Sequence, residues 1–195
     1  MWDQRYNTDE FVYGKKPNDF LVSVIGQIPK GDVLCLAEGE GRNAVYLAKQ
    51  GCQVLAVDGS AVGLGKANKL AAENNVRIET QVADLANFDI ISEKWDAIVS
   101  IFAHVPSDIR KTIHKKIVKG LRSGGVLVLE AYTPEQLKLK TGGPPTEDMM
   151  MSLNSLRQEL KGLDFKLAEE MKRDIAEGKL HAGRGAVVQI FAIKP

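Results

Sequence analysis

Short apolar segments alternate with helix-like segments along most of this chain, and this alternation restricts the fold more than any other feature. Each apolar segment has the length of a buried strand in a parallel sheet. Strands that alternate with helices form a parallel sheet with helices on both faces. We therefore predict an α/β protein with a doubly wound sheet. The expected strands are residues 32–37, 53–58, 76–84, 95–102 and 126–132, and the expected helices are residues 42–50, 60–74 and 106–123.

The last third of the chain departs from this alternation. After a short expected helix at residues 151–160, two strand-like segments follow at residues 165–175 and 186–193. Because the link between them is too short for a crossover helix, these two strands should be antiparallel. Residues 1–20 and 133–148 match neither strand nor helix, and loops of that length in a compact domain are often lids or binding loops.

A glycine-rich turn joins the first expected strand to the first expected helix, in the sequence LCLAEGEGRNA (34–44). Glycine has no side chain to keep a ligand away from the backbone. The free N–H groups at a helix start favour a carboxylate or a phosphate. Gly39, Gly41 and Ala44 also satisfy the GxGxxA pattern of dinucleotide sites. Taken alone, the turn fits either a nucleotide-like ligand or a tight connection without one.

Two aspartates follow the next two strands. Asp58 ends the second expected strand, where its carboxylate can accept hydrogen bonds from both hydroxyls of a ribose. Asp84 ends the third, where it can accept from an adenine amine while Leu85 covers the ring. Each aspartate also fits a plain turn. Their common position at the carboxyl ends of neighbouring strands indicates a ligand site at that edge of the sheet.

The glycine-rich turn, the two aspartates and the terminal hairpin together resemble the class I S-adenosylmethionine (SAM)-dependent methyltransferases over almost the whole chain. The segments EGEGRNAVYLA (38–48) and YGKKPNDFL (13–21) are similar to those of the small bacterial methyltransferases grouped with tellurite-resistance and thiol-type enzymes. The resemblance implies a Rossmann-like sheet of seven strands in the order 3-2-1-4-5-7-6, with strand 7 antiparallel. It also implies SAM as cofactor and methyl transfer to a small-molecule acceptor, such as a thiol or a metalloid oxyanion.

The same resemblance assigns the parts of the cofactor to parts of the chain. The glycine-rich turn would line the methionine portion of SAM, Asp58 would bind the ribose, and Asp84 with its neighbour would bind the adenine. The end of the fourth strand would lie under the sulfonium. The expected cofactor-binding residues are Glu38, Gly39, Glu40, Gly41, Arg42, Asn43, Asp58, Gly59, Ser60, Asp84, Leu85, Ile101 and Phe102.

The chain departs from the family pattern within its first strand. Cys35 stands where an acidic residue is common, and Ala37 stands where a glycine is common. Either Glu38 or a water would then contact the methionine amino group. Arg42 and Asn43 fit a contact to the SAM carboxylate or a plain helix start.

Methyl transfer to a soft anion needs no strong base, whereas a hydroxyl or an amine must lose its proton to a side chain. The expected catalytic residues are His104, after the fourth strand, Tyr13, and His181 in the turn of the terminal hairpin. In the resembling family residues 1–20 fold over the cofactor as a lid, which would exclude water. Each candidate also fits a cap, a loop or a core position. Glu130 fits an acceptor contact or a strand end, and His114 is expected on the surface.

Composition narrows the class of protein. Lys and Arg number 26 against 25 Asp and Glu, and this balance gives no electrostatic case for nucleic acid or an anionic membrane. The start MWDQRYNTDEF lacks the features of a signal peptide, and no apolar run reaches the ~20 residues of a membrane helix. Cys35 and Cys52 lack a zinc-site pattern and should be buried thiols. We expect a cytoplasmic enzyme of one domain, residues 1–195, monomeric or homodimeric, without a metal, nucleic-acid or membrane partner.

Two other readings remain open at this point. An NAD-binding oxidoreductase would also use GxGxxA and Asp58, but 195 residues leave little room for its usual catalytic domain. The YxxxK arrangement of short-chain dehydrogenases is also missing. The other alternative is a non-catalytic SAM-binding module, because binding residues can persist without turnover.

Overall fold

A seven-stranded sheet forms the centre of the computed structural model, which describes residues 2–178 and 182–195. The strand order is β3-β2-β1-β4-β5-β7-β6, as predicted. β7 runs antiparallel to both of its neighbours, and the other neighbouring strands pair in parallel. The strands are β1 (Asp32–Leu36), β2 (Gln53–Asp58), β3 (Glu79–Val82), β4 (Trp95–Ile101), β5 (Leu121–Tyr132), β6 (Asp164–Ala176) and β7 (Ala182–Ile193).

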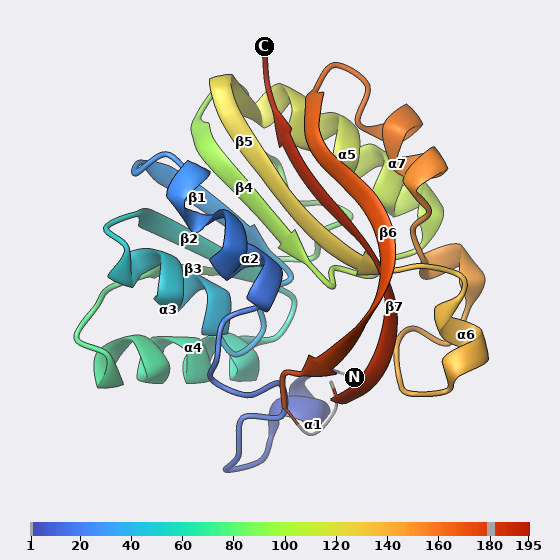
Figure 1. Ribbon diagram of the computed structural model, residues 1–195. Coiled ribbons are helices and arrows are strands. Elements are labelled where there is room, and N and C mark those ends of the chain that lie inside the picture. The colour runs from blue at the N-terminus through green and yellow to red at the C-terminus, as the bar shows by residue number, and fades with distance from the viewer. Residues whose placement is uncertain (1, 179–181) are drawn as a thin grey trace.

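Helices cover both faces of this sheet (Figure 1). One core lies between the sheet and the helices α2, α3 and α4, and the other lies between the opposite face and the helices α5 and α7. The two cysteines are buried in the first of these cores, as expected. The helices are α1 (Trp2–Tyr6), α2 (Asp19–Val24), α3 (Arg42–Lys49), α4 (Ala61–Glu73), α5 (Ser107–Gly120), α6 (Gln136–Leu139) and α7 (Leu153–Glu159), with short 3-10 helices η1 (Ile25–Gln27) and η2 (Glu147–Met149).

Local sequence signals account for the ends of several helices. Ser60 accepts a hydrogen bond from the N–H of Gly63 and so caps α4, as its position predicted. Ser152 and Ser155 form a reciprocal capping box at the start of α7. Gly51 follows α3 with a φ of 94°, the left-handed conformation of a glycine that ends a helix.

Several boundaries differ from the predictions, and β5 and β7 each begin earlier than expected. The helix expected to end at residue 123 ends at Gly120, because Leu121 is already extended and pairs with Trp95 of β4. The third strand covers only residues 79–82, because β3 lies at the sheet edge and pairs over four residues with β2 alone. The loops expected at residues 1–20 and 133–148 contain α1, the start of α2, α6 and the start of η2.

The β6–β7 hairpin extends beyond the rest of the sheet toward α1, at the same end as the carboxyl ends of the parallel strands (Figure 1). This arrangement brings the N-terminal segment, the glycine-rich turn and the end of β6 to one edge of the molecule. Among the described residues, no helix combines the length and the apolar character needed to cross a bilayer.

Candidate functional site

The glycine-rich turn between β1 and α3 adopts left-handed backbone geometry. The φ angles are 50° at Ala37, 59° at Gly39 and 88° at Gly41. A β-carbon at Gly39 would lie 2.5 Å from the hydroxyl oxygen of Tyr6, and one at Gly41 would lie 2.5 Å from the β-carbon of Ala67. Glycine is therefore required at both positions, because the backbone is left-handed there and because a side chain would not fit. Strained backbone of this kind is common at ligand sites.

Glu38 caps the helix that starts after this turn. Its Oε1 accepts hydrogen bonds from the backbone N–H groups of Asn43, at 2.9 Å, and Ala44, at 2.7 Å. Burial raises the pKa of Glu38 to about 7, although these two hydrogen bonds act in the opposite direction. Two of the N–H groups that we expected to meet a ligand are therefore occupied by the protein's own carboxyl group.

Asp58 lies directly beside the glycine-rich turn, as its position at the end of β2 predicted. One carboxylate oxygen accepts from the N–H of Gly39 at 2.9 Å, and the other accepts from the N–H of Ser60 at 2.8 Å. Burial raises the pKa of this carboxyl group, against the effect of the two hydrogen bonds. Since each carboxylate oxygen can accept more than one hydrogen bond, Asp58 keeps the capacity to accept from a ribose.

We expect Asp58→Ala to weaken SAM binding by about 1–3 kcal/mol, which is roughly a 5- to 150-fold rise in Kd. The variant would lose the charge-assisted hydrogen bonds that Asp58 is predicted to accept from the ribose, and it would also lose the bond to the N–H of Gly39. Calorimetric titration with SAM measures this change. Asp84→Ala is the matched comparison, because Asp84 lies one strand further along the same edge of the sheet. An unchanged Kd for Asp58→Ala would show that Asp58 does not belong to the site.

The end of β3 lies next to Asp58, because the N–H of Ala83 donates to the Asp58 carbonyl oxygen at 2.9 Å. Asp84 is exposed, and its carboxylate accepts from the N–H of Ala86. Leu85 is buried, and Gly59 is exposed between Asp58 and the helix cap. The structure thus brings the two predicted carboxylates to one edge, with Asp84 open to solvent. Their contacts to ribose and adenine stay predictions.

The N-terminal segment covers the glycine-rich turn. Lys66 of α4 donates to the carbonyl oxygens of Tyr6 and Glu10, at 3.1 and 2.6 Å, and to a carboxylate oxygen of Glu40 at 2.6 Å. The other carboxylate oxygen of Glu40 accepts from the N–H of Tyr13 at 3.1 Å. The cover therefore depends on Tyr6 and Lys66, which sequence reasoning missed because neither position carries a recognisable motif.

Three aromatic rings lie together where β4 and β5 end, and we call them the acceptor wall. Phe102 and His104 follow β4, and Tyr132 is the last residue of β5. The ring centroids of Phe102 and Tyr132 are 4.8 Å apart, and those of His104 and Tyr132 are 5.6 Å apart with nearly parallel rings. Phe102 has a φ of 53°, so the chain turns sharply after Ile101, which is buried. Left-handed backbone thus follows both β1 and β4 at the same edge of the sheet.

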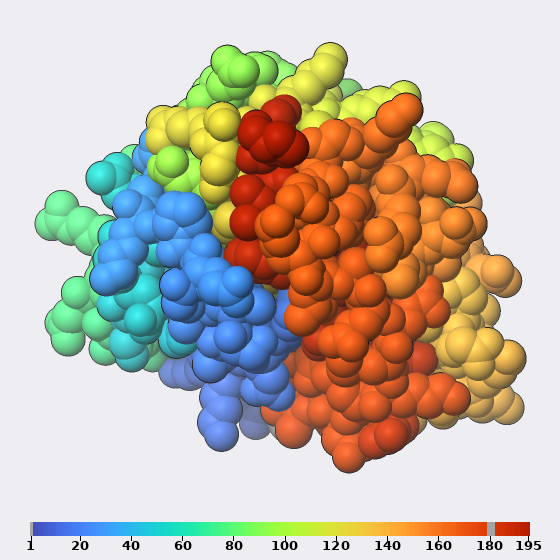
Figure 2. Space-filling view, turned by 45° about the horizontal axis from the view of Figure 1, so that its top comes forward, coloured from blue at the N-terminus to red at the C-terminus, as the bar shows by residue number. Residues whose placement is uncertain are grey.

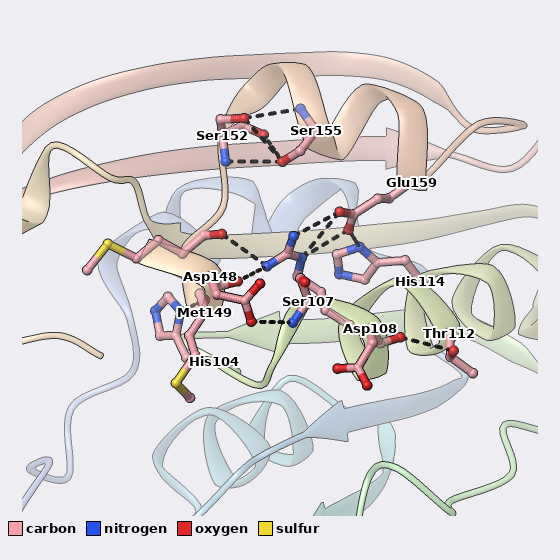
Figure 3. A network of polar contacts seen from close by, with 12 residues as sticks. His104, Ser107, Asp108, Thr112, His114, Asp148, Met149, Ser152, Ser155 and Glu159 are labelled. Carbon is pink, nitrogen blue, oxygen red and sulfur yellow. Dashed lines mark hydrogen bonds and ion pairs between the residues drawn. The ribbon is translucent and has the colours of Figure 1, made fainter. Parts of the chain in front are cut away.

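Both ring nitrogens of His104 are engaged by the backbone. Nδ1 lies 2.9 Å from the carbonyl oxygen of Met149, which lies beside His104 in Figure 3. Nε2 lies 3.3 Å from the backbone nitrogen of Tyr132. A carbonyl partner requires a proton on Nδ1, and an N–H partner requires a lone pair on Nε2, so this pattern fits the neutral imidazole. His104 thereby connects the acceptor wall to the segment after η2.

The remaining expected site residues fall into three groups. Arg42 and Asn43 are buried and face protein partners: Arg42 pairs with Glu177 at 2.6 Å, and Asn43 accepts from the N–H of Asn18 at 2.9 Å. The hydroxyl of Tyr13 accepts from Arg5 at 3.1 Å. His181 lies outside the described residues, so its expected role stays a prediction.

The expectation that His114 lies on the surface is wrong. Its side chain is buried, and its Nδ1 lies 2.6 Å from a carboxylate oxygen of Glu159. The helix pattern alone placed His114 beside the charged residues of α5, whereas α7 packs over that position and supplies a carboxylate. A partner 45 residues further along the chain leaves no local signal in the sequence.

Comparison with known proteins agrees with this geometry. Residues 33–125 match the family model described as a methyltransferase domain, and they include the glycine-rich turn, Asp58, Asp84, Phe102 and His104. The fold is Rossmann-like, and a solved structure of SAM-dependent methyltransferases from Methanosarcina mazei shares it at 16% sequence identity and a TM-score of 0.66. The matched residues make up less than half of the chain, and solved structures of SAM-dependent enzymes share its fold at under 25% identity.

Two curated relatives are similar over part of the chain. A tRNA (uracil(54)-C(5))-methyltransferase of Pyrococcus furiosus is 31% identical over 122 residues, which are 61% of this chain and 28% of that protein. The uncharacterized methyltransferase YbaJ of Bacillus subtilis is 27% identical over 130 residues, which are 62% of this chain and 51% of that protein. The chain thus spans about half or less of the length of these relatives.

The solved structure of TehB from Haemophilus influenzae has the same fold. It superposes with a TM-score of 0.74 over 100% of this chain and 66% of that chain, at 22% sequence identity. The similarity therefore extends beyond the matched domain to the N-terminal segment and the terminal hairpin, the two parts that flank the candidate site.

Proposed function

We propose that this protein transfers the methyl group of SAM to a small-molecule acceptor that carries a soft nucleophile, such as a thiol or a metalloid oxyanion. The observation that carries the proposal is the convergence of Asp58, the left-handed glycine-rich turn and the acceptor wall at one edge of the sheet. When bound, SAM supplies a methyl carbon on a positively charged sulfur, which an acceptor attacks in line with the leaving sulfur.

The residues of the turn fit the cofactor. Gly39 and Gly41 leave the backbone without side chains, and Asp58 provides a carboxylate for ribose hydroxyls. The cover formed by Tyr6, Glu40 and Lys66 excludes water from the turn, and exclusion of water strengthens electrostatic contacts inside a site. The role of these residues is to hold and orient the two reactants.

The protonation of the acceptor wall supports a soft nucleophile as acceptor. Burial raises the pKa of Tyr132 to about 12, so its hydroxyl stays neutral at physiological pH. The lone pair of His104 Nε2 accepts from the N–H of Tyr132, so its bonding fits a ring that holds the backbone rather than one that removes a proton. A thiol can lose its proton to solvent and attack as thiolate, whereas a hydroxyl or an amine benefits more from a base.

The Pyrococcus relative raises a nucleic-acid base as an alternative acceptor. Methylation at a uracil carbon needs an added nucleophile to activate the ring, and a thiolate is the usual kind. Cys35 and Cys52 are both buried, and burial raises the pKa of both thiols. Together with a net charge of +1, this favours a small molecule over an RNA.

The release of S-adenosylhomocysteine tests the proposal. The purified protein is incubated with SAM and, separately, with thiols, selenite, tellurite, small amines and unmodified tRNA. Product with a thiol or a metalloid oxyanion supports the proposal, whereas product with tRNA alone would show that the acceptor class is wrong. Calorimetric titration with SAM and with NADH is the parallel control, since binding of NADH alone would indicate an oxidoreductase.

His104→Ala should lower kcat by roughly tenfold while the Kd for SAM stays nearly unchanged, because a displaced wall misaligns the acceptor. Steady-state kinetics over pH 6–9 measures the effect. A general base would give a different result: its loss costs about 10²–10⁴-fold and removes one limb of the pH profile. That outcome would contradict the holding role of His104 and extend the acceptors to groups that need deprotonation.

A further inference from the structure

Five polar side chains from separate parts of the chain form a cluster inside the protein, which we call the buried ion cluster: Asn18, Arg42, Glu130, Arg173 and Glu177. Arg173 donates to Glu130 and to Glu177, each at 2.7 Å. The side-chain amide of Asn18 reaches the same two carboxylates at 3.1 and 3.0 Å. Arg42 pairs with the second oxygen of Glu177 at 2.6 Å.

Solvent hardly reaches this cluster. Asn18 and Glu130 are 0% exposed, Glu177 is 4% exposed and Arg42 is 7% exposed. Two guanidinium groups and two carboxylates balance one another in charge. Removal of four charges from water is expensive, so such a cluster is weak evidence for added stability. Its value then lies in the geometry that it imposes on the elements that it joins.

The elements joined by the cluster surround the candidate site. Asn18 precedes α2, Arg42 is the first residue of α3 after the glycine-rich turn, and Glu130 is two residues before Tyr132 of the acceptor wall. Arg173 belongs to β6, and Glu177 follows it. Figure 2 shows the blue surface of the N-terminal part of the chain directly beside the orange surface of β6, where Arg173 also lies 3.5 Å from Asp19.

Residues 13–18, YGKKPN, cross the space between α3 and the end of β6. At one end the N–H of Tyr13 donates to Glu40 of the glycine-rich turn. At the other end Asn18 belongs to the buried ion cluster, and its N–H donates to Asn43. Between these points the backbone of the segment meets Gly178, where an added β-carbon would lie 2.5 Å from the Tyr13 carbonyl carbon and 2.6 Å from the nitrogen of Gly14.

We propose that Glu177 is a positioning residue of the methyl-transfer site. With Arg42 and Asn18, it holds residues 13–18 against the end of β6 and so fixes the distance between the glycine-rich turn and the acceptor wall. The inference rests on the proposed function, because acceptor turnover is one of its two readouts. The proposal also gives a role to two residues of the YGKKPN segment. Asn18 donates to the carboxylates of Glu130 and Glu177. Gly14 leaves room for the carbonyl oxygen of Glu177, which would lie only 3.3 Å from an added β-carbon.

Glu177→Gln tests the proposal at the charge, and Gly178→Ala tests it at the backbone contact. Gly178 has a φ of 113°, so an added methyl group is strained there and collides with residues 13–14. Each variant should lower kcat/KM for the acceptor by about tenfold or more, because small misplacements of reactants have large effects on rate. The Kd for SAM should change by less than about threefold, since Asp58 and the glycine-rich turn keep their own contacts.

Limited digestion with trypsin gives a readout that needs no activity. The bond between Lys15 and Lys16 lies within the held segment, and its cleavage reports the fraction of molecules in which that segment is released. Both variants should be cut there about tenfold faster than the unmodified protein. Glu169→Gln is the matched control, because it makes the same change at an exposed position of β6, the strand that ends just before Glu177.

The outcomes separate the inference from the function on which it rests. If both variants fold and keep the kcat/KM and the tryptic resistance of the unmodified protein, the positioning role is wrong. A lower Tm with unchanged kcat/KM and unchanged cleavage would also overturn it, because that result describes a purely structural residue. If the unmodified protein binds no SAM and methylates no acceptor, the proposed function fails, and faster cleavage in both variants alone then decides whether Glu177 holds the segment.

Discussion

Gly41→Ala should destabilise the protein and weaken SAM binding by at least about tenfold, or about 1.4 kcal/mol. The φ of 88° at Gly41 costs a residue with a side chain about 1–2 kcal/mol. The added β-carbon would also lie 2.5 Å from the β-carbon and 2.7 Å from the α-carbon of Ala67, and overpacking of this kind costs about 1–3 kcal/mol. The turn must then move away from α4, and the start of α3 moves with it. Urea unfolding and calorimetric titration with SAM measure the two effects.

Gly65→Ala is the matched control for this experiment. Gly65 lies inside α4, two residues before Ala67, and an added β-carbon there meets nothing within 4 Å. Because alanine is the better helix former, this variant should be neutral or more stable by up to about 1 kcal/mol. SAM affinity should stay unchanged. If Gly41→Ala bound SAM as tightly as Gly65→Ala does, the close approach of the turn to α4 would not matter for the cofactor.

The parts of the fold that were predicted correctly depend on local patterns. Buried strands of a parallel sheet are apolar throughout, so β1, β2 and β4 are visible as short runs of residues such as Val and Leu. The short link after β6 required an antiparallel partner. The same logic placed Asp58 beside Gly39, because Asp58 ends β2 and Gly39 follows the end of the neighbouring strand β1. These features need information from only a few consecutive residues.

The parts that were missed depend on contacts between distant residues. Lys66 gives no sign in the sequence that it holds Tyr6 and Glu40, since that contact exists only after α4 packs beside the N-terminal segment. The helix cap by Glu38 was missed for a related reason: an acidic residue before a glycine turn fits a ligand contact as well as a cap. Burial of His114 needed the position of α7, which no periodicity on α5 contains.

The largest effect on stability is expected at a second buried network, which lies on the face of the sheet that α5 and α7 cover (Figure 3). Glu159 of α7 accepts three hydrogen bonds from Arg110, at 3.0, 3.1 and 3.3 Å, and one from His114 at 2.6 Å. Arg110 also donates to the carbonyl oxygens of Asp148 and Met150, and His104 lies against the carbonyl oxygen between them. Three successive carbonyl groups are thus held by two side chains, and α5, η2 and α7 are fastened together.

Glu159→Ala should lower the free energy of unfolding by about 3–5 kcal/mol, because it leaves the guanidinium of Arg110 buried without a counter-charge. Arg110 is only 5% exposed, so water cannot replace the lost carboxylate without rearrangement of α7. Urea unfolding at pH 7 measures the change. Glu135→Ala is the control, since Glu135 pairs with Lys138 on the surface, where such a pair contributes about 0–1 kcal/mol. Equal losses for the two variants would show that the network adds nothing beyond a surface ion pair.

The pH dependence of this loss has a definite sign. Burial alone would raise the pKa of Glu159, but the hydrogen bonds from His114 and Arg110 lower it from its usual value of 4.5 to about 2. A carboxyl group with a lowered pKa in the folded state contributes stability that is complete above the pKa of the unfolded chain and is lost as the pH falls through the folded value. The difference in unfolding free energy between the unmodified protein and Glu159→Ala should therefore be constant near pH 7 and shrink between pH 4.5 and about 2. A difference that grew in that range would mean that Glu159 is protonated in the folded protein, and its pairing with Arg110 could not then be the source of the stability.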